Sequence, residues 1–139
     1  MLFDQDAEVQ YDAETTAIMK ANEELLSLFA ADIDHLAPKT RKTHLENIDF
    51  YINSYLLHYE PLDFTYGIQK IESFMEDFFI HKCIWSSPSA MRSMAASIKK
   101  FYRSMMVHER IKSSDYDYLC ATIKENMEFW LSECKAEWV

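Results

Sequence analysis

The sequence predicts an all-α fold, a compact bundle of about five helices around one core. Gly67 is the single glycine among 139 residues, and only three residues are prolines. Tight hairpins usually need Gly or Asn-Gly to reach positive φ, so this composition disfavours a many-stranded sheet. Hydrophobic residues make up 49% of the chain, enough to fill a real core. They recur at intervals of three and four residues, which is the helical period.

The first part of the chain is expected to be an acidic leader followed by a helix. Residues 1–11 are interpreted as the leader, and residues 12–139 as a single helical domain. The first helix is predicted from about Asp12 to Asp34, because apolar residues at helical spacing form one stripe there. That stripe consists of Ile18, Ala21, Leu25, Phe29, Ile33 and Leu36.

The second and third helices are separated by the helix-breaking segment HYEPLDF. The second is expected to begin near Pro38, because a proline in the first turn lacks only an N–H that would be unpaired anyway. Its predicted core face is Leu45, Ile48, Ile52 and Tyr55. The third is predicted from about Thr65 to Lys82. Its inward residues are Ile68, Ile71, Phe74, Met75, Phe78 and Phe79.

The fourth helix has the clearest start signal. Ser87 can cap the free amides of the first turn, and Pro88 follows at the first helical position. Its apolar stripe is Met91, Met94, Ile98, Phe101 and Met105. A fifth helix is expected from Ser113 or Ser114 towards Lys135. Its predicted inward residues are Leu119, Ile123, Met127, Trp130 and Cys134.

Charge is distributed unevenly along the chain, whose formal net charge is −9. Residues 1–34 contain nine acidic residues and one basic residue, and residues 113–139 contain six and two. The central segment, residues 35–112, has eight acidic and eleven basic residues and is therefore mildly basic. A protein that grips duplex DNA normally carries a basic footprint, and this segment is the place where one can form.

A local basic face is predicted on the fourth helix. At 100° per residue, Arg92, Lys99 and Arg103 fall within about 20° of one line. Ser89 and Ala96 lie near the same line, so long cations rise from a face of small residues. Such a face suits close approach to a phosphate backbone. The alternative interpretation is an ordinary solvated face of a soluble helix.

Several other functional classes have little support. The five histidines lack ligand spacing, and carboxylate pairs are expected by chance among 23 acidic residues. We therefore predict no catalytic residues, no metal site and no cofactor. The three widely spaced cysteines are expected to be reduced thiols. Neither a signal peptide nor an apolar segment long enough to span a membrane is expected. A cytoplasmic protein without membrane contact is the expectation.

From residue 36 to about residue 125, the order of caps, loops and apolar faces resembles a known DNA-binding domain. It is similar to the core-binding domain of tyrosine recombinases (phage integrases), the SAM-like integrase N-terminal domain, with an extra N-terminal helix. The matching residues are Ala37, Pro38, Lys39 and Thr40; Phe50, Tyr51 and Tyr55; Ile71, Phe74 and Met75; Ser86, Ser87 and Ser89; and Phe101 and Tyr102. Where the family often closes with Gly-x-Ile, this chain has His108, Glu109, Arg110 and Ile111.

The resemblance implies DNA binding without catalysis. Tyrosine recombinases cut DNA with an Arg, a His-x-x-Arg motif and a Tyr nucleophile, and no histidine in this chain has Arg three residues later. The expected function is that of a stand-alone, non-enzymatic relative that binds duplex DNA weakly in a recombination or mobile-element context. The DNA-binding residues implied are Lys39, Arg41, Lys42, Arg92, Lys99, Lys100 and Arg103. Two alternatives are a protein–protein module, for example one that regulates a recombinase, and an acidic DNA mimic.

Overall fold

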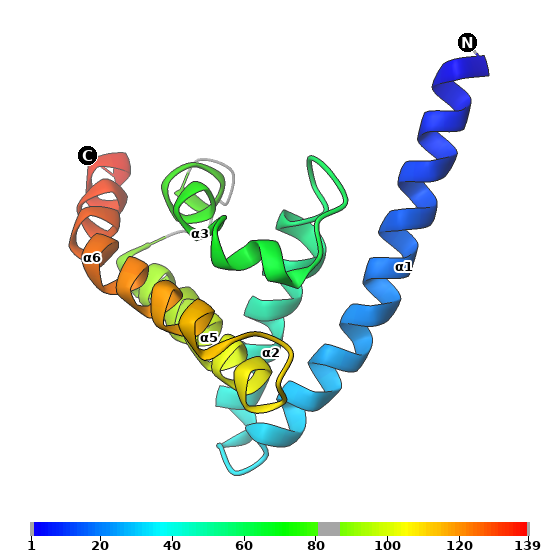
Figure 1. Cartoon of the computed structure of the whole chain (residues 1–139). Helices are drawn as coiled ribbons and strands as arrows, with labels where there is room; N and C mark the ends of the chain where they lie inside the picture. The colour runs from blue at the N-terminus through cyan, green and yellow to red at the C-terminus, as the bar shows by residue number, and fades with distance from the viewer. Residues whose placement is uncertain (1, 81–86, 139) are drawn as a thin grey trace.

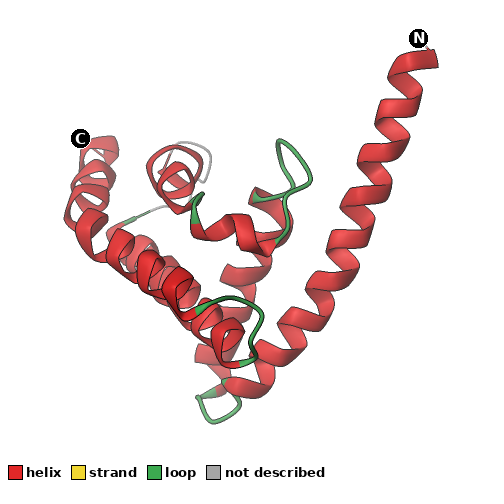
Figure 2. Ribbon diagram, viewed as in Figure 1, coloured by secondary structure: helices red, strands yellow, loops and turns green. Residues whose placement is uncertain are grey.

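The computed structural model describes residues 2–80 and 87–138, and these residues form helices joined by short loops (Figures 1 and 2). The elements are α1 (Leu2–Asp32), α2 (Pro38–Asp49), η1 (Phe50–Tyr55), η2 (Phe64–Ile68), α3 (Ile71–Ser73), η3 (Phe74–Phe79), α5 (Pro88–Val107) and α6 (Ser113–Trp138). No β-strand occurs in the described part of the chain, so the all-α prediction is confirmed there.

The helices α5 and α6 form an antiparallel pair, and both begin where the sequence predicts. The Ser87 hydroxyl accepts a hydrogen bond from the Ala90 N–H at 3.0 Å, and Pro88 opens α5. After α5 the chain turns through Glu109, which adopts a left-handed conformation with φ of 60°. All five residues of the predicted α5 stripe are buried (Met91, Met94, Ile98, Phe101 and Met105).

The N-terminal helix is longer than predicted. It begins at Leu2 rather than near Asp12, so the expected leader is part of α1. The C-terminal half of α1 packs against α2 and α5, whereas its N-terminal half extends away from the other helices (Figure 1). Ala21 was expected in the buried stripe and is exposed. Asn22 is buried in its place and donates a hydrogen bond to Asn53 Oδ1 at 2.7 Å.

The middle of the chain departs most from regular α-helix. The predicted second helix changes after Asp49 from α2 into the π-helix η1. The predicted third helix is divided into a 3-10 helix, a three-residue α-helix and the π-helix η3. The predicted end of that helix at Lys82 lies outside the described residues, as does Cys83.

The core is built largely from aromatic side chains. Fully buried examples are Trp130, Tyr51, Tyr102, Phe29, Phe74, Phe79 and Phe101. Phe101 of α5 contacts Phe29 of α1 edge to face, with ring centroids 5.5 Å apart. It also contacts Phe64 at the start of η2, at 6.2 Å. The core therefore joins α1, α5 and the middle segment into one unit.

Candidate nucleic-acid interface

The solvent side of α5 carries four cations. Arg92, Lys99, Lys100 and Arg103 are all exposed, on the side of the helix opposite its buried stripe. Among the described side chains, those of residues 12–80 and 87–134, no partner forms an ion pair with any of these four. Their charges are therefore available to an external anion.

A polar seam fixes α2 beside α5. His44 Nδ1 lies 2.8 Å from Ser97 Oγ, and the Asn47 amide donates to Ser97 Oγ at 2.9 Å and to Ser93 Oγ at 3.2 Å. Asn47 follows His44 in α2, but it reaches back to Ser93, which precedes Ser97 in α5. The two helices therefore run antiparallel. The start of α2 consequently lies towards the end of α5 that carries Lys100.

The charge of Lys100 acts on His44 in the seam. Burial lowers the pKa of His44, and the positive charge of Lys100 lowers it further. Both effects disfavour the imidazolium form. A neutral imidazole can still donate or accept a hydrogen bond at Nδ1. The contact between His44 and Ser97 therefore needs no positive charge on His44 beside the α5 cations.

The three cations predicted at the start of α2 have different environments. Arg41 forms an ion pair with Asp34 at 3.0 Å, which ties the loop after α1 to α2. Lys42 approaches Glu46, one helical turn later, at 3.8 Å. Lys39 is exposed and makes no ion pair with any described residue. Of the three, Lys39 is therefore best placed to extend the α5 face.

The last turn of α1 closes one end of this face. A cavity of about 380 Å³ between α1 and α5 is lined by Phe29, Asp32, Ile33, His35, Lys100, Arg103, Ser104 and Val107. Asp32 supplies its carboxylate, which accepts hydrogen bonds from Ser104 and, at 2.9 Å, pairs with His108. These contacts engage Asp32, which forms no ion pair with Lys100 or Arg103 in the same lining.

On its other side the face borders α6. Burial chiefly raises the pKa of Tyr116, with a further rise from a hydrogen bond to Cys120, whereas the nearby Arg103 charge opposes these effects. The charge of Arg103 thus acts on Tyr116 of α6, and that of Lys100 acts on His44 of α2. We call Lys39, Arg92, Lys99, Lys100 and Arg103 the basic face.

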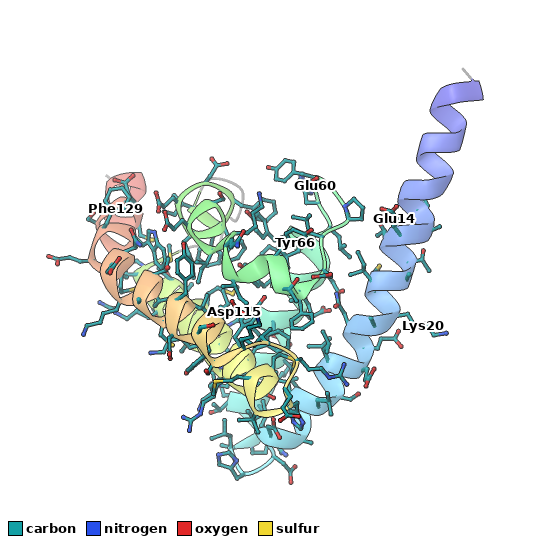
Figure 3. All side chains as sticks on the ribbon, in the orientation of Figure 1. Glu14, Lys20, Glu60, Tyr66, Asp115 and Phe129 are labelled. Carbon is teal, nitrogen blue, oxygen red and sulfur yellow. The ribbon has the colours of Figure 1, made fainter. Side chains whose placement is uncertain are left out.

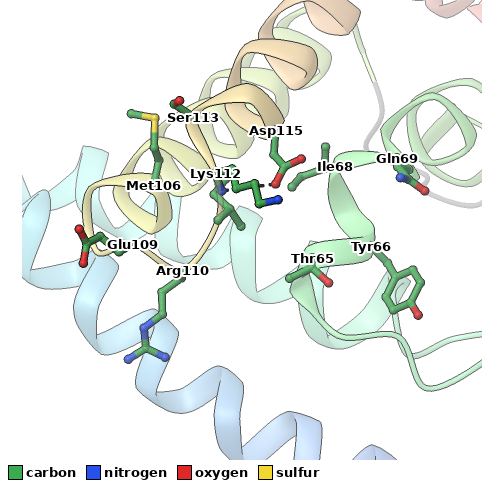
Figure 4. A pocket seen from close by; sticks show the side chains of 11 residues that line it. Thr65, Tyr66, Ile68, Gln69, Met106, Glu109, Arg110, Lys112, Ser113 and Asp115 are labelled. Carbon is green, nitrogen blue, oxygen red and sulfur yellow. Dashed lines mark hydrogen bonds between the residues drawn. The ribbon is translucent and has the colours of Figure 1, made fainter.

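A larger cleft lies away from the basic face, between η2 and the turn from α5 to α6 (Figure 4). Its volume is about 700 Å³. Arg110 extends from the turn towards α1 and forms an ion pair with Glu24 at 2.8 Å. The Lys112 N–H donates to Asp115 at 3.3 Å at the start of α6. These contacts fasten the turn to its neighbours and engage much of the charge in the cleft.

The polar seam residues Asn47, Ser93 and Ser97 were missed by the sequence analysis. The signal was present, because Ser93 and Ser97 lie one turn apart on the flank of the predicted basic line. What the sequence could not show was which helix faced them.

The described residues contain neither a metal-binding cluster nor a membrane-spanning helix. Within the described ranges, no group of three or more His, Cys, Asp or Glu side chains is arranged to hold a metal ion. None of the described helices combines the length and the apolar character that crossing a bilayer requires. No protein-family model, curated protein or solved structure matches the chain.

Proposed function

We propose that this protein is a stand-alone, non-catalytic relative of the integrase core-binding domain that binds duplex DNA weakly through the basic face. The observation that supports this most strongly is the set of four exposed α5 cations, none of which has an ion-pair partner among the described side chains of residues 12–80 and 87–134. Side chains of this kind contact phosphate oxygens, which position a protein on a duplex without reading its sequence. The expected binding is therefore independent of sequence.

The basic face is small, and this limits the affinity. If all five cations contact phosphates, the slope of log affinity against log salt is about −4 to −5, since each phosphate contributes roughly −0.9. The acidic segments, residues 1–34 and residues 113–139, repel the duplex at long range. Binding should consequently be strongest at low ionic strength.

A titration with labelled duplex DNA at two or three salt concentrations tests the proposal. The double variant Arg92→Ala/Lys99→Ala should weaken binding to every sequence and reduce the salt slope by roughly 2. The matched control is Lys20→Ala/Lys124→Ala, which removes the same charge from exposed positions on α1 and α6. Long-range attraction changes equally in both variants, so only a local contact separates them.

Two results would contradict the proposal. One is the absence of duplex binding by the wild-type protein at about 50 mM salt, where electrostatic affinity is favoured. The other is an equal effect of the two double variants, which would show a dependence on net charge alone.

A protein-interaction module is the second candidate. It is favoured by the N-terminal half of α1, which extends away from the bundle (Figure 1). Between Asp12 and Ala21 only Thr15 and Ile18 are partly covered. If the duplex titration is negative, this function takes first place, and deletion of residues 2–11 should then abolish partner binding without unfolding the bundle.

A further inference from the structure

An aromatic pocket lies on a different part of the molecule from the basic face. It has a volume of about 270 Å³ and is formed by the end of η1, the following loop, and α3 with η3. Three aromatic rings line it, those of Tyr55, Tyr59 and Phe78. The rest of the lining consists of Leu56, Glu60, Leu62, Lys70, Ser73 and Asp77. Glu60 belongs to the loop between η1 and η2 (Figure 3).

The rings of Tyr55 and Tyr59 both pack against the ring of Phe78 at steep angles. The Tyr55 ring is tilted 59° from the Phe78 ring, with centroids 5.0 Å apart. The Tyr59 ring is nearly perpendicular to the Phe78 ring, at 82° and 6.4 Å. Tyr59 is 61% exposed, yet His58 packs against its ring at 4.5 Å and against that of Phe78 at 5.3 Å. These contacts hold the exposed Tyr59 ring in place at the pocket, which it lines.

Among the described residues that line the pocket, two are carboxylates, Glu60 and Asp77, and one is an ammonium group, Lys70. The hydroxyl of Tyr55 points towards the backbone oxygen of Lys70, at 3.5 Å. Burial chiefly raises the pKa of Tyr55, and the nearby Asp77 charge adds to the rise, whereas a hydrogen bond with Ser73 opposes it. Asp77 itself also lines the pocket.

The backbone that presents these groups is unusual. Tyr55 is the last residue of the π-helix η1, and Asp77 and Phe78 belong to the π-helix η3. Well under 1% of residues in globular proteins are π-helical, and π-helical turns occur frequently at functional sites. Two such segments meeting at one pocket provide an argument for function that is independent of the aromatic lining.

We propose that the aromatic pocket binds an alkylated ammonium cation of the trimethylammonium type. The faces of aromatic rings attract a cation within about 6 Å of the ring centroid, and quaternary ammonium groups are the ligands most often recognised this way. Leu56 and Leu62 offer apolar contact to the methyl groups, and Glu60 and Asp77 balance the charge. A free metabolite and a trimethylated lysine side chain of a protein share this chemistry.

The decisive experiment compares choline with its neutral isostere, 3,3-dimethylbutan-1-ol, by NMR titration of the full chain up to millimolar ligand. The two molecules have nearly the same shape, so any preference reports charge. Choline should shift the resonances of Tyr59 and its neighbours and bind roughly tenfold or more tightly than the alcohol, the ratio expected from cation–π attraction. Equal binding of the two, or no binding of choline, would overturn the proposal.

Variants test the residues. Tyr59→Leu should reduce choline affinity by about tenfold, whereas Tyr59→Phe should retain it. Tyr118→Leu on α6 is the matched control, because Tyr118 is 56% exposed and does not line the pocket. Asp77→Asn should weaken binding, and Lys70→Met should strengthen it by removing the competing cation. An unchanged affinity in Tyr59→Leu, with the helical circular dichroism intact, contradicts the assignment.

A second titration separates the sources of the ligand. Short peptides with trimethyllysine or unmodified lysine are compared with choline. Tighter binding of the trimethyllysine peptide than of choline assigns the pocket to a modified protein, and the reverse assigns it to a free metabolite. A lysine peptide that binds as tightly as its trimethylated form would argue against recognition of the alkylated ammonium.

Discussion

The helix α5 and the segment from Phe50 to Ile80 bury similar apolar side chains on different backbones. In α5, 20 residues of regular helix present their apolar positions as one stripe. Adjacent buried pairs occur in both regions, for example Phe101 with Tyr102 in α5 and Phe78 with Phe79 in η3, but the backbone of η3 is π-helical. In α5 the buried residues follow the period of a regular α-helix. In η3 the aromatic residues are closely spaced, and the backbone is a π-helix instead of an α-helix.

The largest expected effects come from truncating one ring in each region. Phe101→Ala and Phe74→Ala should each cost about 3–5 kcal/mol of unfolding free energy, through lost burial and a cavity. Both side chains have no exposed surface. Urea denaturation measures the two costs. If Phe74→Ala is nearly neutral, the π-helix relaxes around the cavity and the two regions differ in rigidity as well as in geometry.

A smaller effect is expected at Gly67 in η2. A Cβ added there would lie 2.0 Å from the Tyr102 hydroxyl and 2.8 Å from Tyr51 Cε2. Gly67→Ala should therefore destabilise the fold by about 1–3 kcal/mol, the usual range for overpacking. Thermal and urea melts measure the loss. A cost well under 1 kcal/mol would show that the contact between η2 and α5 adjusts easily.

The α5 cap tests the regular region alone. Ser87→Ala should cost about 1 kcal/mol, because the Ala90 N–H loses its partner. Ser89→Ala is the control, since Ser89 is exposed within the first turn and its replacement should change stability by less than about 0.5 kcal/mol. Equal losses of stability for the two variants in urea melts would show that helix propensity, rather than the Ser87 cap, stabilises the start of α5.

The smallest expected effect is a pH dependence from His44. Its pKa is lower in the folded protein than the ordinary value of 6.5, so the unfolded chain binds the proton more tightly. The stability contribution is therefore fully present above about pH 6.5 and is lost as pH falls through the lowered folded pKa. Urea melts at pH 7 and pH 5 should show a smaller decline for His44→Gln than for the wild type. An equal decline in the two proteins would show that the carboxylates, and not His44, cause the whole pH dependence of stability.

The sequence predicted α5 well because its signals are local. The cap at Ser87, Pro88 and the five-residue apolar stripe lie within one segment and act through one backbone period. All six inward residues that it predicted for the third helix are in the core as well, although other buried residues of the middle segment, such as Leu56 and Ile80, were not predicted. It did not predict the π-helices, because the shift from an i−4 to an i−5 hydrogen bond depends on how aromatic rings from distant positions pack.

The candidate sites show the same limit. The exposure of Arg92, Lys99 and Arg103 followed from helical geometry alone. The pairing of Arg41 with Asp34 depends on the loop that joins α1 to α2, which no periodicity describes. The aromatic pocket depends on bringing Tyr59 to Phe78 across the intervening loop and η2, a juxtaposition that no local pattern encodes.

The length of α1 has a consequence for how the molecule moves in solution. A helix of 31 residues is about 46 Å long at 1.5 Å per residue. A compact chain of 139 residues has a radius of gyration of about 14 Å, so α1 is longer than such a globule is wide. The protein therefore tumbles as a body with a protruding rod, more slowly about its short axes than about its long one. A label attached near Leu2 reports chiefly on the rod, and one on α6 reports on the bundle.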